Sequence, residues 1–198
     1  AWVFSIYMLT STATMPVYGK LSDIYGRKPV YIAGIALFLV GSMMSGLANS
    51  MLELIIFRGV QGLGAGALLP IAFTIIGDLF TTEQRAKMWG LFSGVWGVSS
   101  LIGPLVGGFL VDQVNWRWVF YVNLPFGLVA GALIWFALDE SQTPRAARSI
   151  DYAGVALLVS GIVAFLLMLL EGPNAGWLSL PIIALGALEC WWARKTAL

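Results

Sequence analysis

The chain has 198 residues, of which 59% are hydrophobic and only 11% are charged, and its mean hydropathy is +0.86. A soluble domain carries about 25% charged residues, so a chain this apolar cannot cover a water-facing surface, and we expect the lipid bilayer to be its solvent. The net charge of +1 argues against nucleic acid as a partner. Histidine is absent and Cys190 is the single cysteine, so we expect no disulfide, no metal, no cofactor and no enzyme activity.

Long apolar runs follow one another along the whole chain. A bilayer core about 30 Å thick needs about 20 apolar residues per helix. The runs are continuous rather than alternating, which argues against a membrane β-barrel, and their glycines and prolines are tolerated in membrane helices. We therefore predict an all-α membrane protein with seven spans, at approximately residues 1–18, 29–49, 52–77, 88–111, 118–138, 152–171 and 178–193.

Basic residues are unevenly divided between the two sets of connections. The set around residues 50, 112–117 and 172–177 contains only Arg117, and Arg58 lies inside a span. The positive-inside rule places the other set in the cytoplasm. That set contains nine basic residues: Lys20, Arg27, Lys28, Arg85, Lys87, Arg145, Arg148, Arg194 and Lys195.

The polar stretch 139–150 is the one linker that the sequence predicts. It separates a helical bundle over residues 1–138 from a final helical pair over 151–198. The patterns S-x-x-E from Ser50 and T-x-x-Q from Thr81 predict capping boxes at two helix starts. The chain opens directly in an apolar run without an initiator methionine, so we expect a fragment that lacks its natural start.

The connection after the first run carries the most specific pattern, G-x-L-x-D-x-x-G-R-K from Gly19 to Lys28. Any positive-inside loop would be basic, and two glycines allow tight turns, but this spacing is much more specific. It resembles the loop between the second and third helices of the major facilitator superfamily. The resemblance implies a charge relay by Asp23 and Arg27 with an opposing half, and close helix approach at Gly19. Gly26 and Lys28 complete the pattern.

The third run contains an arginine, Arg58, in the stretch R-G-V-Q-G-L-G-A-G. An arginine within a span is a functional candidate by default, and the alternative is an arginine that snorkels near a helix end. Gly62 and Gly66 form a small-x-x-x-small face for close packing. The stretch resembles the fourth-helix motif of the same family, which implies proton coupling by Arg58 with Gln61 and Gly62. Glu53 is explained by capping.

The fourth run combines small residues with a proline. Its small residues recur at helical spacing, and Pro104 cannot donate to the carbonyl of Ser100, so we expect the helix to bend there. The G-P-x-x-G-G ending resembles the fifth-helix motif of antiporters in the family, with Ser99 where that motif has glycine. This resemblance is the main reason to predict export rather than uptake. Its residues are Gly90, Ser99, Gly103, Pro104, Gly107 and Gly108.

The outer end of the fifth run is aromatic. An interfacial belt anchored by arginine would explain Trp116, Arg117 and Trp118. The order W-R-W-x-F-x-x-N-x-P-x-G, which includes Asn123 and Pro125, resembles the drug:proton antiporter branch with fourteen helices. In that branch two extra helices join the halves, and the last two runs fit them.

The resemblance covers nearly the whole chain. It implies helices two to six of an N-terminal half plus two linking helices, with the first helix and the C-terminal half missing. The expected function is proton-coupled export of drug-like or amphipathic molecules across the cell membrane, with substrate, protons and the missing half as partners. One defined metabolite, such as a siderophore or an amino acid, and a non-transporting membrane sensor are the alternatives. A single half cannot alternate access, so we predict that this piece alone does not transport.

Overall fold

The computed structural model describes residues 2–138, 152–176, 179–180 and 182–186. Within these residues the regular structure is helical, which confirms the predicted all-α class. The elements are α1 (Trp2–Tyr25), α2 (Arg27–Leu47), α3 (Met51–Leu79), α4 (Thr82–Phe109), the π-helical turn η1 (Leu110–Val114), α5 (Trp118–Tyr121), α6 (Asn123–Ala137) and α7 (Tyr152–Ala175).

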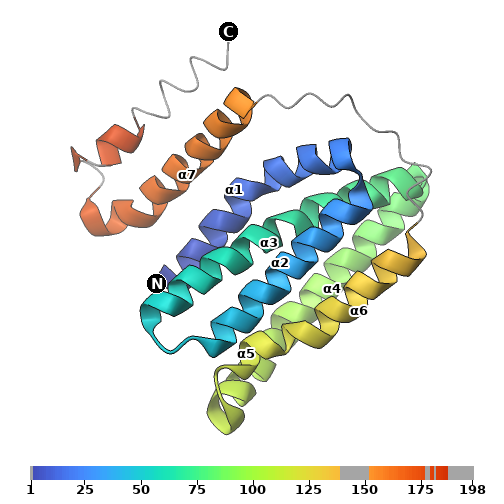
Figure 1. Ribbon diagram of the computed structural model, residues 1–198, viewed down its shortest axis with the longest axis horizontal. Helices are drawn as coiled ribbons and strands as arrows, with labels where there is room; N and C mark the ends of the chain where they lie inside the picture. The colour runs from blue at the N-terminus through green and yellow to red at the C-terminus, as the bar shows by residue number, and fades with distance from the viewer. Residues whose placement is uncertain (1, 139–151, 177–178, 181, 187–198) are drawn as a thin grey trace.

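α3 is the central helix of the bundle. It packs along α1 on one side and along α2 on the other, while α6 lies against α2 and α7 against α1 (Figure 1). α4 touches α3 only slightly and keeps most of its apolar side chains exposed within the described part. An exposed apolar helix of this kind requires apolar surroundings, as the composition predicts.

Glycines set the close spacing of the three central helices. A Cβ atom built at Gly62 would lie 2.6 Å from the carbonyl oxygen of Tyr7, and one at Gly66 would lie 2.7 Å from that of Ser11, so both glycines face α1. This confirms the predicted small-x-x-x-small face. Gly64 faces α2, where an added Cβ would lie 2.7 Å from the Gly34 carbonyl oxygen.

Five described helical segments are long and apolar enough to cross a membrane: Arg27–Leu47, Met51–Leu79, Thr82–Val114, Trp118–Ala137 and Ala153–Ala175. They correspond to five of the seven predicted spans. The segment from Trp118 is interrupted at Val122, which divides it into α5 and α6. The linker 139–150 lies outside the described residues, as does most of the run 178–193, of which residues 182–186 are helical.

The first predicted span forms helix α1 but is not one of these five. Serine, threonine, tyrosine and proline lower its hydropathy. Its hydroxyl groups bond back to carbonyls one turn earlier, with Thr10 Oγ1 at 2.9 Å from the Ile6 oxygen and Thr14 Oγ1 at 2.8 Å from the Thr10 oxygen. The helix therefore satisfies these two hydroxyls itself while it packs against α3.

Two of the connections between helices end in the predicted caps. Ser50 Oγ accepts the Glu53 N–H at 3.2 Å, and Gln84 Oε1 accepts the Thr81 N–H at 3.1 Å. The Glu53 carboxylate accepts the N–H of Asn49 at 2.8 Å, which lies one residue before the cap. The capping role predicted for Glu53 is thus confirmed, with the donor shifted by one residue from the Ser50 N–H to the Asn49 N–H.

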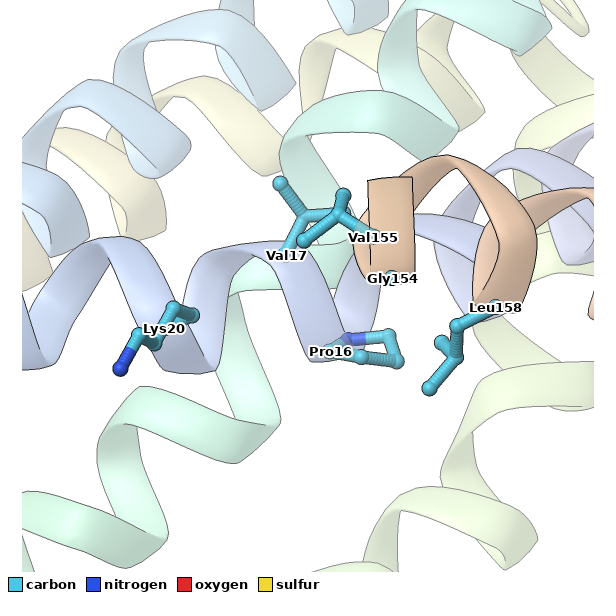
Figure 2. Close-up of a pocket in the computed structure, with 6 residues that line it drawn as sticks. All are labelled: Pro16, Val17, Lys20, Gly154, Val155 and Leu158. Atoms are coloured by element: carbon cyan, nitrogen blue, oxygen red, sulfur yellow. The ribbon is translucent and has the colours of Figure 1, made fainter. Parts of the chain in front are cut away.

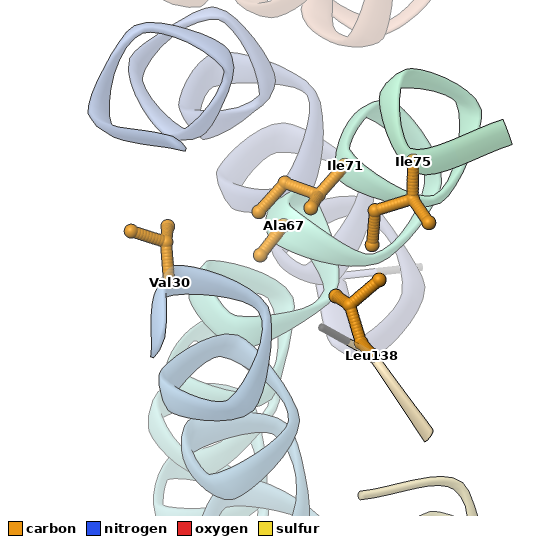
Figure 3. Close-up of a cluster of buried hydrophobic side chains, with 5 residues drawn as sticks. All are labelled: Val30, Ala67, Ile71, Ile75 and Leu138. Atoms are coloured by element: carbon orange, nitrogen blue, oxygen red, sulfur yellow. The ribbon is translucent and has the colours of Figure 1, made fainter. Parts of the chain in front are cut away.

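The apolar core lies at the end of the bundle where α2 begins and where α3 and α6 end. Figure 3 shows its five side chains converging from these elements. Tyr18 and Leu21 of α1 pack against the same cluster. The core consists of Val30, Ala67, Ile71, Ile75 and Leu138. It fixes the positions of the α1–α2 turn and the polar residues around it.

Candidate functional site

The α1–α2 connection is tighter than the sequence predicts. Helix α1 continues through Gly19 to Tyr25, and Gly26 alone forms the turn, with a φ angle of 104° that favours glycine. A Cβ atom built at Gly19 meets no described atom within 4 Å. The expected loop start at Gly19 is therefore corrected to Gly26, while the close helix approach at Gly19 finds no partner among the described residues and stays a prediction.

Arg27, the first residue of α2, is the centre of a charge cluster at this turn. Its Nη1 atom pairs with the Asp23 carboxylate and lies 3.2 Å from Ser22 Oγ. Its Nε atom donates to Oδ2 of Asp78, at the end of α3, at 3.1 Å. Asp78 belongs to none of the motifs recognised in the sequence. An acid at the end of the third run, on the same side as the basic loop, was the available signal.

Other basic residues hold neighbouring helices at the same end. Lys28 Nζ donates to the Leu138 carbonyl oxygen at 3.0 Å and lies 5.4 Å from the centre of the Trp135 ring. Arg85 Nε donates to the Phe80 carbonyl oxygen at 2.9 Å. Carbonyls at helix ends lack intrahelical partners, so these cations satisfy them. The structure thus brings basic residues from alternate connections to one end of the bundle.

Replacing Asp78 by asparagine is expected to lower the free energy of unfolding by about 1 kcal/mol or less, because the pair is partly exposed and Asp23 still accompanies Arg27. Replacing Arg27 by glutamine should lower it more, because two carboxylates then face each other without a cation. Unfolding in mixed micelles of increasing SDS fraction measures both. A larger loss of unfolding free energy for Asp78→Asn than for Arg27→Gln would contradict the assigned pairing. Glu83→Gln, at the same end of the bundle, is the control.

The second cluster surrounds Arg58 in α3. Its Nε atom donates to the Val3 carbonyl oxygen at 3.2 Å, and Nη1 donates to Gln61 Oε1 at 2.6 Å. The guanidinium lies 4.1 Å from the ring centre of Tyr7 and 5.8 Å from that of Phe120. Within the described residues no carboxylate pairs with it. Arg58 is therefore held by neutral groups of the protein.

A buried polar network continues from this arginine through Gln61. Gln61 Nε2 donates to Ser42 Oγ of α2 at 3.0 Å, and Asn123 Nδ2 of α6 donates to the same oxygen at 3.1 Å. Ser42 Oγ in turn donates to the Phe120 carbonyl oxygen at 2.9 Å. Gln61 is 2% exposed and Ser42 is 0% exposed. The network joins the Arg58 motif to the aromatic motif from Trp116 to Gly127, because Gln61 belongs to the first and Asn123, 62 residues later in the chain, belongs to the second. Ser42 was not identified from the sequence.

The stripe of small residues on α4 lies open in the described part of the chain. Cβ atoms built at Gly90, Gly103, Gly107 and Gly108 meet nothing described within 4 Å. The smooth packing face predicted there finds no partner among the described helices, and Ser99 on the same stripe is exposed. Pro104 lies inside α4, and the bend at this proline stays a prediction.

The aromatic motif from Trp116 to Gly127, called the outer motif below, lies at the opposite end of the bundle. Arg117 Nη2 donates to the carbonyl oxygen of Ala48, the C-cap of α2, at 2.8 Å, and its guanidinium lies 4.9 Å from the Trp116 ring centre. Trp118 meets Tyr121 edge to face. Pro125 lies in the first turn of α6, where the missing N–H has no intrahelical partner to lose.

Two hollows flank the central helices. One, of about 250 Å³, lies between α1 and α7, where Figure 2 shows Lys20 beside an apolar wall with Pro16 and Val17 facing Val155 and Leu158. The other, of about 340 Å³, lies between α3 and α4 and is lined by Leu69, Phe73, Trp89, Phe92, Ser93 and Trp96. The Phe73 ring centre lies 4.6 Å from that of Trp89, so its wall is largely aromatic.

The sequence is similar to known membrane transporters along almost its whole length. The family model described as Major Facilitator Superfamily matches residues 1–193. Multidrug transporter protein MdtP of Bacillus subtilis (strain 168) is 45% identical over 188 residues, which cover 94% of this chain and 35% of that protein. Multidrug resistance protein 3 of the same organism is 48% identical over 186 residues, which cover 93% of this chain and 36% of that protein.

A fungal protein and a solved structure extend this similarity. The efflux pump dotC of Dothistroma septosporum is 40% identical over 176 residues, which cover 86% of this chain and 30% of that protein. The crystal structure of an auto-inhibited peptide transporter of the POT family aligns with a TM-score of 0.65 at 16% identity, over 96% of this chain and 42% of that one. The chain therefore spans about a third of the length of these curated relatives.

Proposed function

Since this chain belongs to the major facilitator superfamily, whose members are multi-pass membrane transporters, we propose that it is part of a proton-coupled exporter of drug-like, amphipathic molecules in the cell membrane. The printed names of the relatives, two multidrug proteins and an efflux pump, support this assignment. Residues 1–138 then form an N-terminal half without its first helix. The fourteen-helix drug:proton antiporter branch accounts for residues 151–198 as linking helices, and a C-terminal half completes the transporter.

The arrangement of Arg58 carries the proposal of proton coupling. A guanidinium inside an apolar span is costly unless it is paired or hydrated, and here its described partners are a carbonyl, an amide and two rings, all neutral. A carboxylate that approaches such a cation loses its proton, and one that moves away binds it again. Arg58, Gln61 and Gly62 can therefore couple a conformational change to proton release, with Gly62 keeping α1 close to the arginine.

The two other features fit an alternating-access cycle. The Arg27 cluster holds the α1–α2 turn against the end of α3, where an opposing half would meet it. The open stripe of α4, with Pro104 near the C-terminal end of the helix, is a smooth surface for that same half. An aromatic hollow between α3 and α4 suits planar, lipophilic and cationic molecules, because ring faces attract cations.

Drug efflux by the protein expressed from its complete gene tests the function. In a drug-sensitive host, energised cells should expel several unrelated lipophilic cations, such as ethidium, and a protonophore should stop the efflux. Activity restricted to one siderophore or amino acid would establish the metabolite alternative instead. Absence of any coupled flux from purified, reconstituted protein would overturn the transporter proposal and leave the sensor alternative.

The 198-residue chain reconstituted by itself should give no drug-dependent proton flux, because a single half has no partner against which to alternate access. Quenching of a pH-sensitive dye inside proteoliposomes measures this. The protein from the complete gene, reconstituted in the same lipid, is the positive control. Robust coupled flux from the short chain would show that the described helices suffice.

A further inference from the structure

The polar network between α2, α3 and α6 has a fixed direction that follows from its chemistry. A hydroxyl has one proton to donate and two lone pairs to accept with. Ser42 uses its proton on the Phe120 carbonyl oxygen, so it can only accept from the amides of Gln61 and Asn123. Gln61 must then direct its NH₂ group to the serine and its oxygen to Arg58.

The other end of the network requires the same orientation. A guanidinium is a donor only, so the amide that contacts Arg58 must present its oxygen. Because both ends agree, a single orientation of the Gln61 amide satisfies its hydrogen bonds to Arg58 and to Ser42, and reversing that amide would break both bonds at once.

We propose that Asn123 and Ser42 are positioning residues for Arg58. They act through the amide of Gln61, and they keep the guanidinium at one depth and in one orientation in the span. The inference rests on the proposed proton-coupled function. It gives Asn123 a role in positioning the arginine, which the aromatic, interfacial sequence around this asparagine does not indicate.

The surrounding packing makes this chain of contacts rigid. A Cβ atom built at Gly41 would lie 2.5 Å from Cα of Gln61, so α2 approaches α3 closely at the glutamine itself. Phe120 takes part twice, since its carbonyl oxygen accepts from Ser42 and its ring lies 5.8 Å from the Arg58 guanidinium. The α5–α6 junction therefore contacts the arginine both directly and through the network. A movement of α6 would be transmitted to the cation.

The test compares variants of the protein expressed from its complete gene. Asn123→Ala and Ser42→Ala should each lower the maximal rate of drug/proton exchange by about 5-fold or more, while the KM for drug changes by less than about 2-fold. The pH profile should move to higher pH, because a less well-held cation leaves the approaching acid with its proton bound more tightly. Ser42→Thr keeps the hydroxyl and should restore most of the rate.

A second variant separates positioning from simple support of the fold. Gln61→Met keeps the length of the side chain but has no N–H to donate to Ser42 and no oxygen to accept from Arg58, so it interrupts the network between Asn123 and the arginine. In that background the Asn123→Ala change should add no further shift of the pH profile. Ser160→Ala removes an exposed serine of α7 that bonds only to the Leu157 carbonyl oxygen among described groups, and it should behave like the unmodified protein.

Two outcomes overturn the inference, and they differ from failure of the function itself. If exchange is intact in the unmodified protein and pH profiles are unchanged in folded Asn123→Ala and Ser42→Ala variants, these residues do not position the arginine. If the Asn123→Ala shift persists in full in the Gln61→Met background, Asn123 acts by another route. Absence of exchange in the unmodified protein would instead refute the proposed function.

Discussion

Arg58→Lys is expected to reduce coupled drug/proton exchange by about 100-fold, because it removes two charge-assisted hydrogen bonds of about 1.5 kcal/mol or more each. Lysine keeps the charge but loses the planar fork that reaches the Val3 carbonyl and the Gln61 oxygen together. It also loses the flat stacking on Tyr7. Drug-dependent proton flux into proteoliposomes, made with the protein from the complete gene, measures the effect.

The matched control for this result is Arg85→Lys. Arg85 also bonds to backbone carbonyls, but it lies at the end of the bundle outside the apolar run. Its replacement should leave exchange within about 2-fold, since a solvated lysine can satisfy the same helix-end carbonyls. Normal exchange by a folded Arg58→Lys protein would show that charge alone suffices and that the arrangement around the guanidinium has no role in coupling.

Gly64→Ala is expected to destabilise the helical bundle by about 2 kcal/mol or more, because overpacking at a backbone contact cannot be relieved by a side-chain rotation. The added methyl group would overlap the backbone nitrogen of Phe38 and lie 2.7 Å from the Gly34 carbonyl oxygen. Helices α2 and α3 would have to separate along the contact that also contains the Gln61 network. SDS-induced unfolding in mixed micelles and the apparent Tm in detergent measure the loss.

Gly77→Ala provides the control in the same helix. A Cβ atom at Gly77 meets nothing described within 4 Å, and alanine in a helix interior is favoured over glycine by about 0.5–1 kcal/mol. This variant should therefore be as stable as the unmodified protein or slightly more stable. Equal stability of the two variants would mean that α2 and α3 are not packed at Gly64 as described.

The pairing around Arg27 shows where sequence reasoning stops. Asp23 lies four residues before the arginine, in the last turn of α1, and the single-residue turn at Gly26 keeps the two side chains close although they belong to different helices. Asp78 is 51 residues away, and its contact depends on how α3 ends beside the α1–α2 turn. No local pattern distinguishes it from any other acid at a helix end.

Ser42 and Ser45 make the same contrast within one helix. A serine in an apolar helix usually bonds back to a carbonyl one turn earlier, and Ser45 does so with the Gly41 oxygen at 2.8 Å. Ser42 instead donates to the Phe120 carbonyl across the helix interface, at 2.9 Å. Their sequence surroundings are alike, so only the packing of α2 between α3 and the α5–α6 junction decides which serine joins the network.

The sequence by itself determined the helical class, the order of five spans, the gathering of basic residues at one end of the described bundle and the presence of an arginine within an apolar run, because these depend on hydropathy, helical period and charge along the chain. It also placed Gln61 one turn from Arg58 on the same helix face. The tertiary structure decided that Gly26 alone makes the first turn and that Gly64 faces α2. It also decided that Asp78 pairs with Arg27 and that Asn123 reaches Gln61 through Ser42. These contacts join residues far apart in the chain, and they form only where packing brings two helix faces to one depth.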